Sequence, residues 1–539
     1  MACLGITSDP RTKNQAHILR SSTSALKNHA TPTTSRQIPP TYMEKMVSLP
    51  AEVIQLIVTL IRDAPPPKKP RSPFGNRAKP AKLAQYTIVS RQWQEIVERM
   101  IWQQINISKK GSLEQLKELT SGDSYRRARA GYIRHILWSP EINTQELHAK
   151  TQGNDDVRVQ LLPDWYLQQC QSSIIDLFEL LDAWKDHQTN MELSLWLSDD
   201  NYLDVGDDEE IEQEEWESLN LDQLWRKGKV PNLLHLTADA IQNVPTLPYI
   251  TCFRLHEVRD SNVRPSAFFR FLSHFPHVQH VSSGEGRVVP RGALQALADQ
   301  RQEVVDHLSL VPESVDTFTY SISAQRELSI NPAHNAANYI SSEGLDDFSI
   351  AFRTLSTRLR ELHLEGVRIS SALFWPVAEE KVDAKSLYWP NLEVVKVLEA
   401  PPYTADGKWI IDNDPEKDWE GDLEEDSFEP WQYDSEYYAQ RGVIKSYEVD
   451  RLYESMGLAV QRMPRLRELK FSFRGEIGER GSHEYLEFGR DMTTDKTTLK
   501  ISTEWEYKMG EKVISAWGLK DEKANEFRDT WSVSLDQWP

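Results

Sequence analysis

The feature that most constrains this chain is a short apolar pattern that recurs from residue 233 onward. The pattern apolar-x-x-apolar-x-apolar indicates a short strand after a turn, with a helix or loop returning to the next strand. It occurs at Leu233/Leu236/Ala238, Val315/Phe318/Tyr320, Leu359/Leu362/Leu364, Leu392/Val395/Val397 and Leu466/Leu469/Phe471, with a shorter match at Val278/Val281. The starts lie 45, 37, 44, 33 and 74 residues apart, and the last gap is about two units long. The pattern therefore predicts a repeated α/β architecture.

This unit resembles a leucine-rich repeat, although it is stretched well beyond the usual repeat length. The Asn that normally follows the strand is missing in every copy. The resemblance therefore implies an irregular α/β solenoid. Two earlier segments fit the same architecture, because Ser173 to Trp184 has the apolar spacing of a helix and Met191 to Leu197 alternates as a strand does.

The segment from Val47 to Ile105 has a different, helical pattern. Pro50 and Glu52 suit the first turn of a helix, and an apolar stripe with helical spacing follows at Val53, Leu56, Ile57, Leu60 and Ile61. Six prolines among Lys and Arg then end the helix between Ala64 and Pro80, which predicts an extended linker. Helical spacing resumes at Leu83, Tyr86, Val89, Trp93, Ile96, Val97 and Met100.

These residues resemble the F-box, and more narrowly the F-box proteins abundant in filamentous fungi. The resemblance rests on Leu49-Pro50 opening an apolar helix, on Val89-Ser90-Arg91-Gln92-Trp93, and on Trp102. The later segment Met463-Pro464-Arg465-Leu466-Arg467-Glu468-Leu469 is similar to the C-terminal region of the same group. The long proline-rich insertion departs from the family pattern, and Ser90 stands where many members carry Cys.

The expected organisation is a small three-helix F-box followed by a leucine-rich-repeat-like solenoid. We expect a disordered tail over residues 1–46, the F-box over 47–108 with a loop at 64–82, and an α/β domain over 109–539. Two acidic insertions interrupt that domain, at 199–217 with eleven acids and no base, and at 412–436 with twelve acids and one base. The first 45 residues are also compatible with a transit peptide or with translation from Met43 or Met46.

Charge and cysteine content narrow the classes of partner and compartment. The net charge of −20 comes from the two acidic insertions, which together contribute −22. A nucleic acid is therefore a poor partner, because phosphate binding needs a basic surface. No apolar run approaches the length of a membrane span, so we expect no membrane partner. Cys3, Cys170 and Cys252 form no disulfide or zinc spacing, which favours an intracellular location, cytoplasmic or nuclear.

The chain carries no recognisable catalytic, cofactor-binding or metal-ligating motif. Phosphate loops, the Gly-x-Ser-x-Gly elbow and His-Glu-x-x-His are missing. His274, His277 and His280 lack a completing ligand and are interpreted as surface or loop residues, and the residues after Asp412 fail the calcium-loop pattern in both registers. Cys170 is interpreted as a core residue. We therefore expect a binding protein without a cofactor and not an enzyme.

The F-box resemblance implies a substrate-recognition adaptor of a Skp–cullin–F-box ubiquitin ligase. It implies that the Skp adaptor is bound by Leu49, Pro50, Ile54, Ile57, Val89 and Trp93. A protein substrate, which the sequence does not identify, would bind the repeat region. Two alternatives remain open, namely a repeat scaffold outside any ligase and an enzyme with an unrecognised site.

Overall fold

The computed structural model describes the chain in separate stretches, which form two compact units. The described residues are 50–63, 90–108, 111–140, 155–196, 238–256, 263–285, 294–322, 337–378, 380, 382–413, 441–473, 485–519 and 527–535. The first unit comprises the described residues up to Trp138 together with Trp184–Met191, and the second comprises the remaining described residues. The expected tail (1–46), linker (64–82) and first acidic insertion (199–217) lie outside the described residues.

The first unit is mainly helical. Its elements are α2 (Ala51–Asp63), α3 (Arg91–Trp102), β1 (Gln104–Ile107), α4 (Ser112–Thr120), α5 (Ser124–Ala130) and β2 (His135–Trp138). Strands β1 and β2 pair in parallel, with Ile105 opposite Ile136. The segment 184–191 is tied to this unit by the buried Gln188, whose side-chain amide donates to the carbonyls of Ala130 and Ile133.

Helix starts in this unit follow from local chemistry. The backbone N–H groups of Val53 and Ile54 donate to the carbonyl of Pro50, so the proline occupies the position before the first turn of α2. Ser90 caps α3, because its hydroxyl accepts a hydrogen bond from the backbone N–H of Trp93 at 3.3 Å. The start of α2 agrees with the helix that the sequence predicts after Pro50.

The predicted helical spacing from Leu83 to Met100 does not form one helix, because Ser90 is extended and α3 begins at Arg91, and residues 83–89 lie outside the described residues. Ile105, predicted within the helical segment, lies in strand β1.

The second unit alternates strands and helices along the chain. Its first half consists of α7 (Asp155–Asp182), β3 (Met191–Trp196, of which Met191 belongs to the first unit), β4 (Ile250–His256), α10 (Pro265–Ser273), β5 (His280–Glu285), α11 (Leu294–His307), β6 (Thr317–Ile322), α13 (Asp347–Ser356), β7 (Glu361–Glu365) and β8 (Val394–Ala400). Its second half consists of β9 (Ile411–Asn413), β10 (Arg441–Ile444), α15 (Ser446–Val460), β11 (Glu468–Phe473), β12 (Tyr485–Asp491), β13 (Lys496–Tyr507), α16 (Glu511–Ala516) and β14 (Phe527–Leu535).

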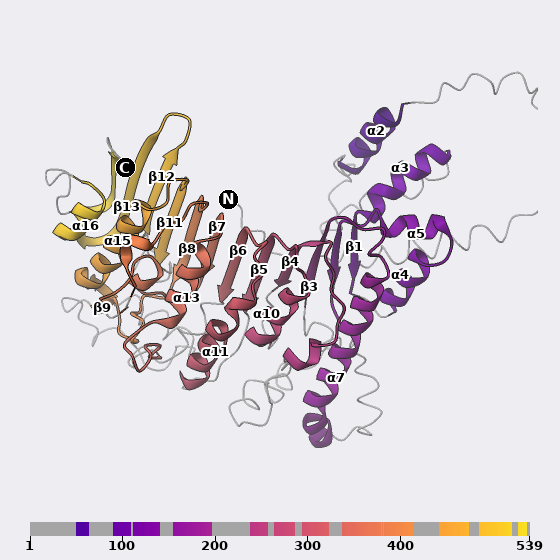
Figure 1. Ribbon diagram of the computed structural model, residues 1–539, viewed down its shortest axis with the longest axis horizontal. Helices are drawn as coiled ribbons and strands as arrows, with labels where there is room; N and C mark the ends of the chain where they lie inside the picture. The colour runs from indigo at the N-terminus through magenta and orange to yellow at the C-terminus, as the bar shows by residue number, and fades with distance from the viewer. Residues whose placement is uncertain are drawn as a thin grey trace, which may run out of the picture. The chain divides into compact units, whose positions relative to one another are not determined.

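The main sheet of this unit keeps the strands in chain order. Strands β4, β5, β6, β7, β8 and β11 pair in parallel, each with the next, and β12, β13 and β14 continue the sheet in antiparallel fashion. Figure 1 shows these strands side by side, and β9 and β10 form a separate antiparallel pair. The fold of the described chain is therefore α/β, as the sequence predicts.

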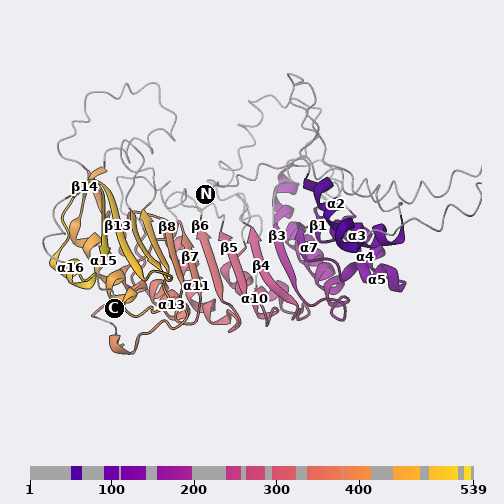
Figure 2. The ribbon, with the colours of Figure 1, turned by 90° about the horizontal axis from the view of Figure 1, so that it is seen from above.

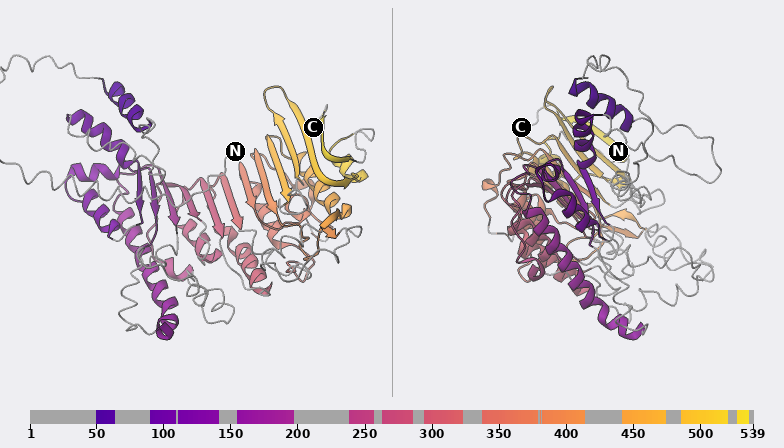
Figure 3. Two further views of the ribbon diagram at one scale, coloured as in Figure 1. Left: turned by 180° about the vertical axis from the view of Figure 1, so that it is seen from behind. Right: turned by 90° about the vertical axis from the view of Figure 1, so that its right-hand side faces the viewer.

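One face of the sheet forms the core. A continuous row of buried apolar residues crosses β4 to β8 and β11 to β13, one from each of these strands: Phe253, Val281, Phe318, Leu362, Val395, Leu469, Phe488 and Leu499. Helices α10, α11 and α13 lie on one side of the strands in the view from above (Figure 2) and from behind (Figure 3). Aromatic packing joins the two layers, since the ring of Phe352 on α13 lies 6.0 Å from that of Phe318 and 5.7 Å from that of Tyr320.

The apolar pattern in the sequence marks the strands with a constant offset. Five strands begin two residues after the first apolar position of the pattern, at His280, Thr317, Glu361, Val394 and Glu468. The helix expected at 173–184 corresponds to the C-terminal part of α7, which ends two residues earlier, at Asp182. The strand expected at 191–197 is β3. Leu233 lies outside the described residues, and of the second acidic insertion only Asp412 and Asn413 are described, in β9.

Candidate functional site

Helix α2 presents an apolar face to solvent. Val53, Leu56 and Leu60 recur at three- and four-residue spacing and are 38%, 59% and 62% exposed, respectively. Large aliphatic side chains in contact with water lose roughly 1.5–3 kcal/mol each relative to full burial, so a cluster of three is a candidate binding surface. We call Val53, Leu56 and Leu60 the outer face of α2.

The opposite side of α2 holds the helix pair together. Ile54 and Val58 are buried there against Val97 of α3. Trp93, Ile96, Met100 and Ile101 are partly buried and pack around this cluster. The inner side of α2 is thus already occupied within the first unit, and its outer face is what remains for a partner.

The residues that the resemblance implies for Skp binding do not all lie on the outer face of α2. Pro50 is exposed at the start of α2, and Ile57 is half-buried beside the outer face. Trp93 is half-buried and packs on the inner cluster, where Ile54 is only 1% exposed. Leu49 and Val89 lie outside the described residues. Sequence reasoning placed Val53, Leu56 and Leu60 on one stripe with Ile57 but did not distinguish their outer position.

Polar contacts fix α5 beside α3. The side-chain amide of Gln94 donates to the Tyr125 hydroxyl at 2.6 Å, and the Arg129 guanidinium lies 3.5 Å from the Glu98 carboxylate. Burial, together with a hydrogen bond to Glu98 and its negative charge, raises the pKa of Tyr125 to about 12. Arg129 also lies over the ring of Trp102, 5.3 Å from its centre.

The second candidate surface is the polar face of the sheet in the second unit. A row of polar residues crosses it at matching register positions: Arg254, Ser282, Thr319, His363, Lys396, Lys470, Glu487 and Lys500. None of these is fully buried, whereas the neighbouring positions on the other face are. Along this row Arg254 lies on β4, hydroxyl groups lie on β5 and β6, an imidazole lies on β7, and charged side chains follow from β8 onward.

Charges on that face are largely compensated by each other. Glu468 lies 3.3 Å from Lys396 and 3.0 Å from Lys470, and Lys470 also lies 3.6 Å from Glu487. Burial and the positive charge of Lys396 lower the pKa of His363, so this imidazole stays neutral at pH 7. A partner on this face would meet alternating charges and hydroxyl groups instead of a field of one sign.

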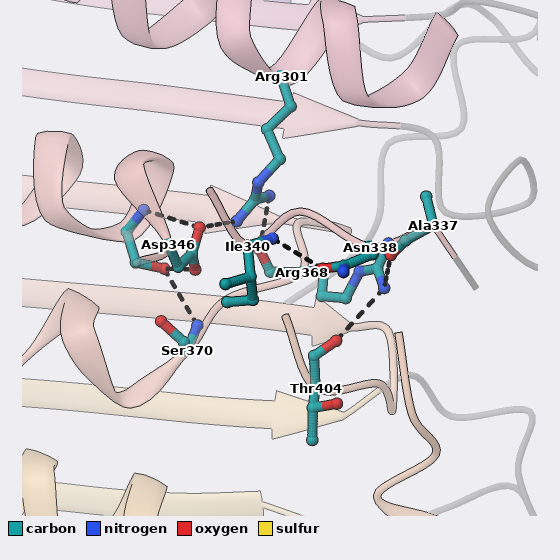
Figure 4. Close-up of polar contacts among 9 residues, drawn as sticks. Arg301, Ala337, Asn338, Ile340, Asp346, Arg368, Ser370 and Thr404 are labelled. Atoms are coloured by element: carbon teal, nitrogen blue, oxygen red, sulfur yellow. Dashed lines mark hydrogen bonds and ion pairs between the residues drawn. The ribbon is translucent and has the colours of Figure 1, made fainter. Parts of the chain in front are cut away.

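A buried polar network lies where β6, β7 and β8 are followed by their connecting segments (Figure 4). Arg301 of α11 pairs with Asp346 at 2.8 Å and donates to the carbonyl of Arg368 at 2.8 Å. Arg368 in turn donates to the carbonyls of Ala337 and Thr404, at 2.8 and 3.3 Å. Open α/β sheets often bind ligands at this edge, but here the chain's own side chains fill it. The network therefore joins consecutive connections.

The described residues offer no metal centre and no membrane helix. No group of three or more His, Cys, Asp or Glu within them is arranged to hold a metal ion. Nor do the described stretches include a helix that combines the length and the apolar character needed to span a bilayer. The interpretation of His274 as a surface residue is wrong, because His274 is buried at the C-cap of α10, where burial and the nearby Arg270 lower its pKa. His277 and His280 are exposed, as expected.

Comparison of the chain with known protein families finds no matching family model, and a search of curated proteins finds no significant match.

Proposed function

We propose that the chain is a substrate-recognition adaptor that docks the Skp adaptor of a Skp–cullin–F-box ubiquitin ligase through its first unit. The proposal combines the F-box resemblance of Leu49-Pro50 and Val89–Trp93 with one structural observation. That observation is the exposed outer face of α2, because three aliphatic side chains facing water fit a partner of apolar surface.

Different residues of α2 stabilise the helix pair and face solvent. Ile54 and Val58 stabilise the helix pair, so Leu56 and Leu60 can be buried by a partner without loosening the unit. Ile57 and Pro50 lie beside or near this face and would extend the contact. The unknown protein substrate would bind the second unit, where the polar face of the sheet provides hydroxyl groups and paired charges.

No chemistry is assigned to this chain in the proposal. An adaptor of this kind raises the effective concentration of a substrate beside ubiquitin that is carried by another subunit. No cofactor is needed for that role.

The test is co-purification of the full chain with the Skp adaptor. The double variant Leu56→Asp/Leu60→Asp should abolish the complex, because two carboxylates would have to be buried in an apolar contact. Gln55→Asp is the matched control, since Gln55 is exposed on the same helix but off the outer face. If the wild-type chain binds no Skp adaptor, the proposal is wrong, and a scaffold outside the ligase or an enzyme with an unrecognised site remains. Undiminished binding by the double variant would show that another surface makes the contact.

A further inference from the structure

The same pentapeptide, Arg-Leu-Arg-Glu-Leu, occurs at 358–362 and at 465–469. The two copies lead into β7 and β11, which flank β8 in the sheet. Glu393, the residue before β8, is the position that corresponds to the second arginine of each copy. The backbone N–H of Glu393 donates to the carbonyl of Arg360, and the backbone N–H of Arg467 donates to the carbonyl of Glu393. Sequence and register therefore place Arg360, Glu393 and Arg467 in one line.

Both arginines bind the carboxylate of Glu393. Arg360 donates from Nε and Nη2 to Oε1, at 3.2 and 2.9 Å, and Arg467 lies 2.8 Å from Oε2. The side chains of Arg360 and Arg467 remain 55% and 50% exposed. One carboxylate thus binds two guanidinium groups side by side, and each group has further N–H donors.

The first arginines of the two copies have different roles. Arg358 is half-buried and donates to the carbonyls of Pro312 and Val311, at 2.6 and 2.8 Å, so it stabilises a connection. Arg465 is exposed in the turn before β11, and Arg462 is exposed three residues earlier. The first arginine of the second copy, Arg465, therefore adds positive charge to the surface, whereas Arg358 of the first copy is half-buried.

We propose that Arg462, Arg465 and Arg467, together with Arg360, form a docking site for a short acidic segment of a partner protein. We call these four residues the arginine cluster. Glu393 neutralises one of its charges, and Asp316 and Glu361 lie near Arg360, so the positive excess lies on the β11 side. Two or three carboxylates of a partner fit this excess, with paired hydrogen bonds from each guanidinium.

Charge over the rest of the chain favours a short peptide over a nucleic acid. Residues 139–539 carry 33 more acidic than basic residues, of which 22 belong to the two acidic insertions. The rest of this stretch still carries 11 more acidic than basic residues, so the cluster is a local exception. Neighbouring strands lie about 4.8 Å apart, so a site over β7, β8 and β11 spans roughly 10 Å. An acidic segment can place two or three of its carboxylates within that length and leave the others in solvent.

The test measures binding of the full chain to a fluorescein-labelled octapeptide of alternating Asp and Glu, by the fluorescence anisotropy of the peptide at low salt. Arg465→Gln/Arg467→Gln should weaken binding about tenfold or more, because each lost charged hydrogen bond accounts for about 1.5–3 kcal/mol. Added salt should weaken wild-type binding, since the site is exposed. Arg91→Gln/Arg127→Gln is the matched control with the same change in net charge, made at exposed positions of the first unit.

Several outcomes would overturn the proposal. They are no binding of the octapeptide to the wild-type chain, an equal loss in the control variant, or tighter cluster-dependent binding of a single-stranded oligonucleotide of equal charge. Binding that emerges only after removal of residues 414–436 would identify the chain's own acidic segment as the occupant. Circular dichroism of each variant checks the fold, and the single variant Arg465→Glu, at an exposed turn position, keeps the test valid if the double variant unfolds. The proposal does not depend on Skp docking by the first unit.

Discussion

Arg301 and Asp346 form an ion pair at 2.8 Å in which the two side chains are only 10% and 1% exposed. They are 45 residues apart in the chain and come from α11 and from the N-cap of α13, where Asp346 also accepts a hydrogen bond from the hydroxyl of Ser349 at 2.5 Å. Removing one partner of a buried pair leaves a buried charge without compensation. The pair therefore stabilises the contact between α11 and the start of α13.

We predict that Asp346→Asn destabilises the second unit by about 3–5 kcal/mol at pH 7. Burial raises the pKa of Asp346, but the charge of Arg301 and the hydrogen bonds from Ser349 and Arg301 outweigh it and lower the pKa below 3.8. Because the folded-state pKa is the lower one, this contribution is present above that ordinary value and is lost as pH falls through the folded pKa. Melting temperatures at pH 7 and pH 3 should show the gap between wild type and variant closing in acid.

The neighbouring residue provides the control for this prediction. Burial and the negative charges of Asp346 and Glu343 raise the pKa of Asp347, so its ionisation opposes folding. Asp347→Asn should therefore leave the melting temperature at pH 7 unchanged or slightly higher. Equal losses in the two variants would mean that the capping turn, and not the ion pair, is the sensitive feature.

We predict that substitutions of two apolar residues in α2 differ in their effect on stability. Ile54→Ala should destabilise the helix pair by about 2–4 kcal/mol, because the side chain is buried against Val97. Leu60→Ser should change stability by less than about 0.5 kcal/mol, because Leu60 is 62% exposed. Hydrogen exchange of the amides in 51–63 measures both effects locally, which a global melt of two units would not. Faster exchange in Leu60→Ser would show that the outer face is part of the core.

The strands of the second unit could be predicted because their apolar residues repeat locally. The offset of two residues between pattern and strand holds at five strands, since the first apolar residue of each pattern precedes the strand, as Leu359 precedes β7. Strand β4 was not predicted, although Ile250/Phe253/Leu255 has the spacing of the pattern. Its strand begins at the first apolar residue of the pattern and not two residues later. The antiparallel strands β12 to β14 were also missed, as they follow no repeat.

The buried charges could not be predicted from the sequence. Arg368 is 1% exposed and Arg353 is 2% exposed, yet both read as surface residues because their acceptors are distant in the chain. Arg353 pairs with Glu380, 27 residues away, and donates to the carbonyl of Ala372 at 2.7 Å. In α2 the stripe was predicted, but periodicity alone does not tell which part faces α3. Ile54 was therefore assigned to partner binding, whereas its side chain lies in the core.

We predict that Gly457→Ala destabilises the contact between α15 and α16 by about 1–3 kcal/mol. A Cβ atom at Gly457 would lie 3.0 Å from backbone atoms of Ala516, which cannot move without shifting α16. This cost exceeds the gain of up to about 1 kcal/mol that Ala normally brings to a helix interior. Chemical denaturation of the variant measures the balance, with Arg451→Ala at an exposed position of α15 as the control. A stabilised Gly457→Ala variant would mean that the two helices separate easily.

We predict that Ser356→Ala costs about 1–3 kcal/mol because it leaves a buried donor without its acceptor. The indole N–H of Trp389 donates to the Ser356 hydroxyl at 2.7 Å, and Trp389 is fully buried. Trp389→Phe removes the donor together with part of the ring. The total loss of stability in the double variant should therefore be smaller than the sum of the losses in the two single variants. Urea denaturation of the two single variants and the double variant measures this coupling. Additive losses would show that the hydrogen bond from Trp389 contributes nothing, which would leave the hydrogen bond from the Ser356 hydroxyl to the carbonyl of Arg353 and the volume of Ser356 as the source of the loss.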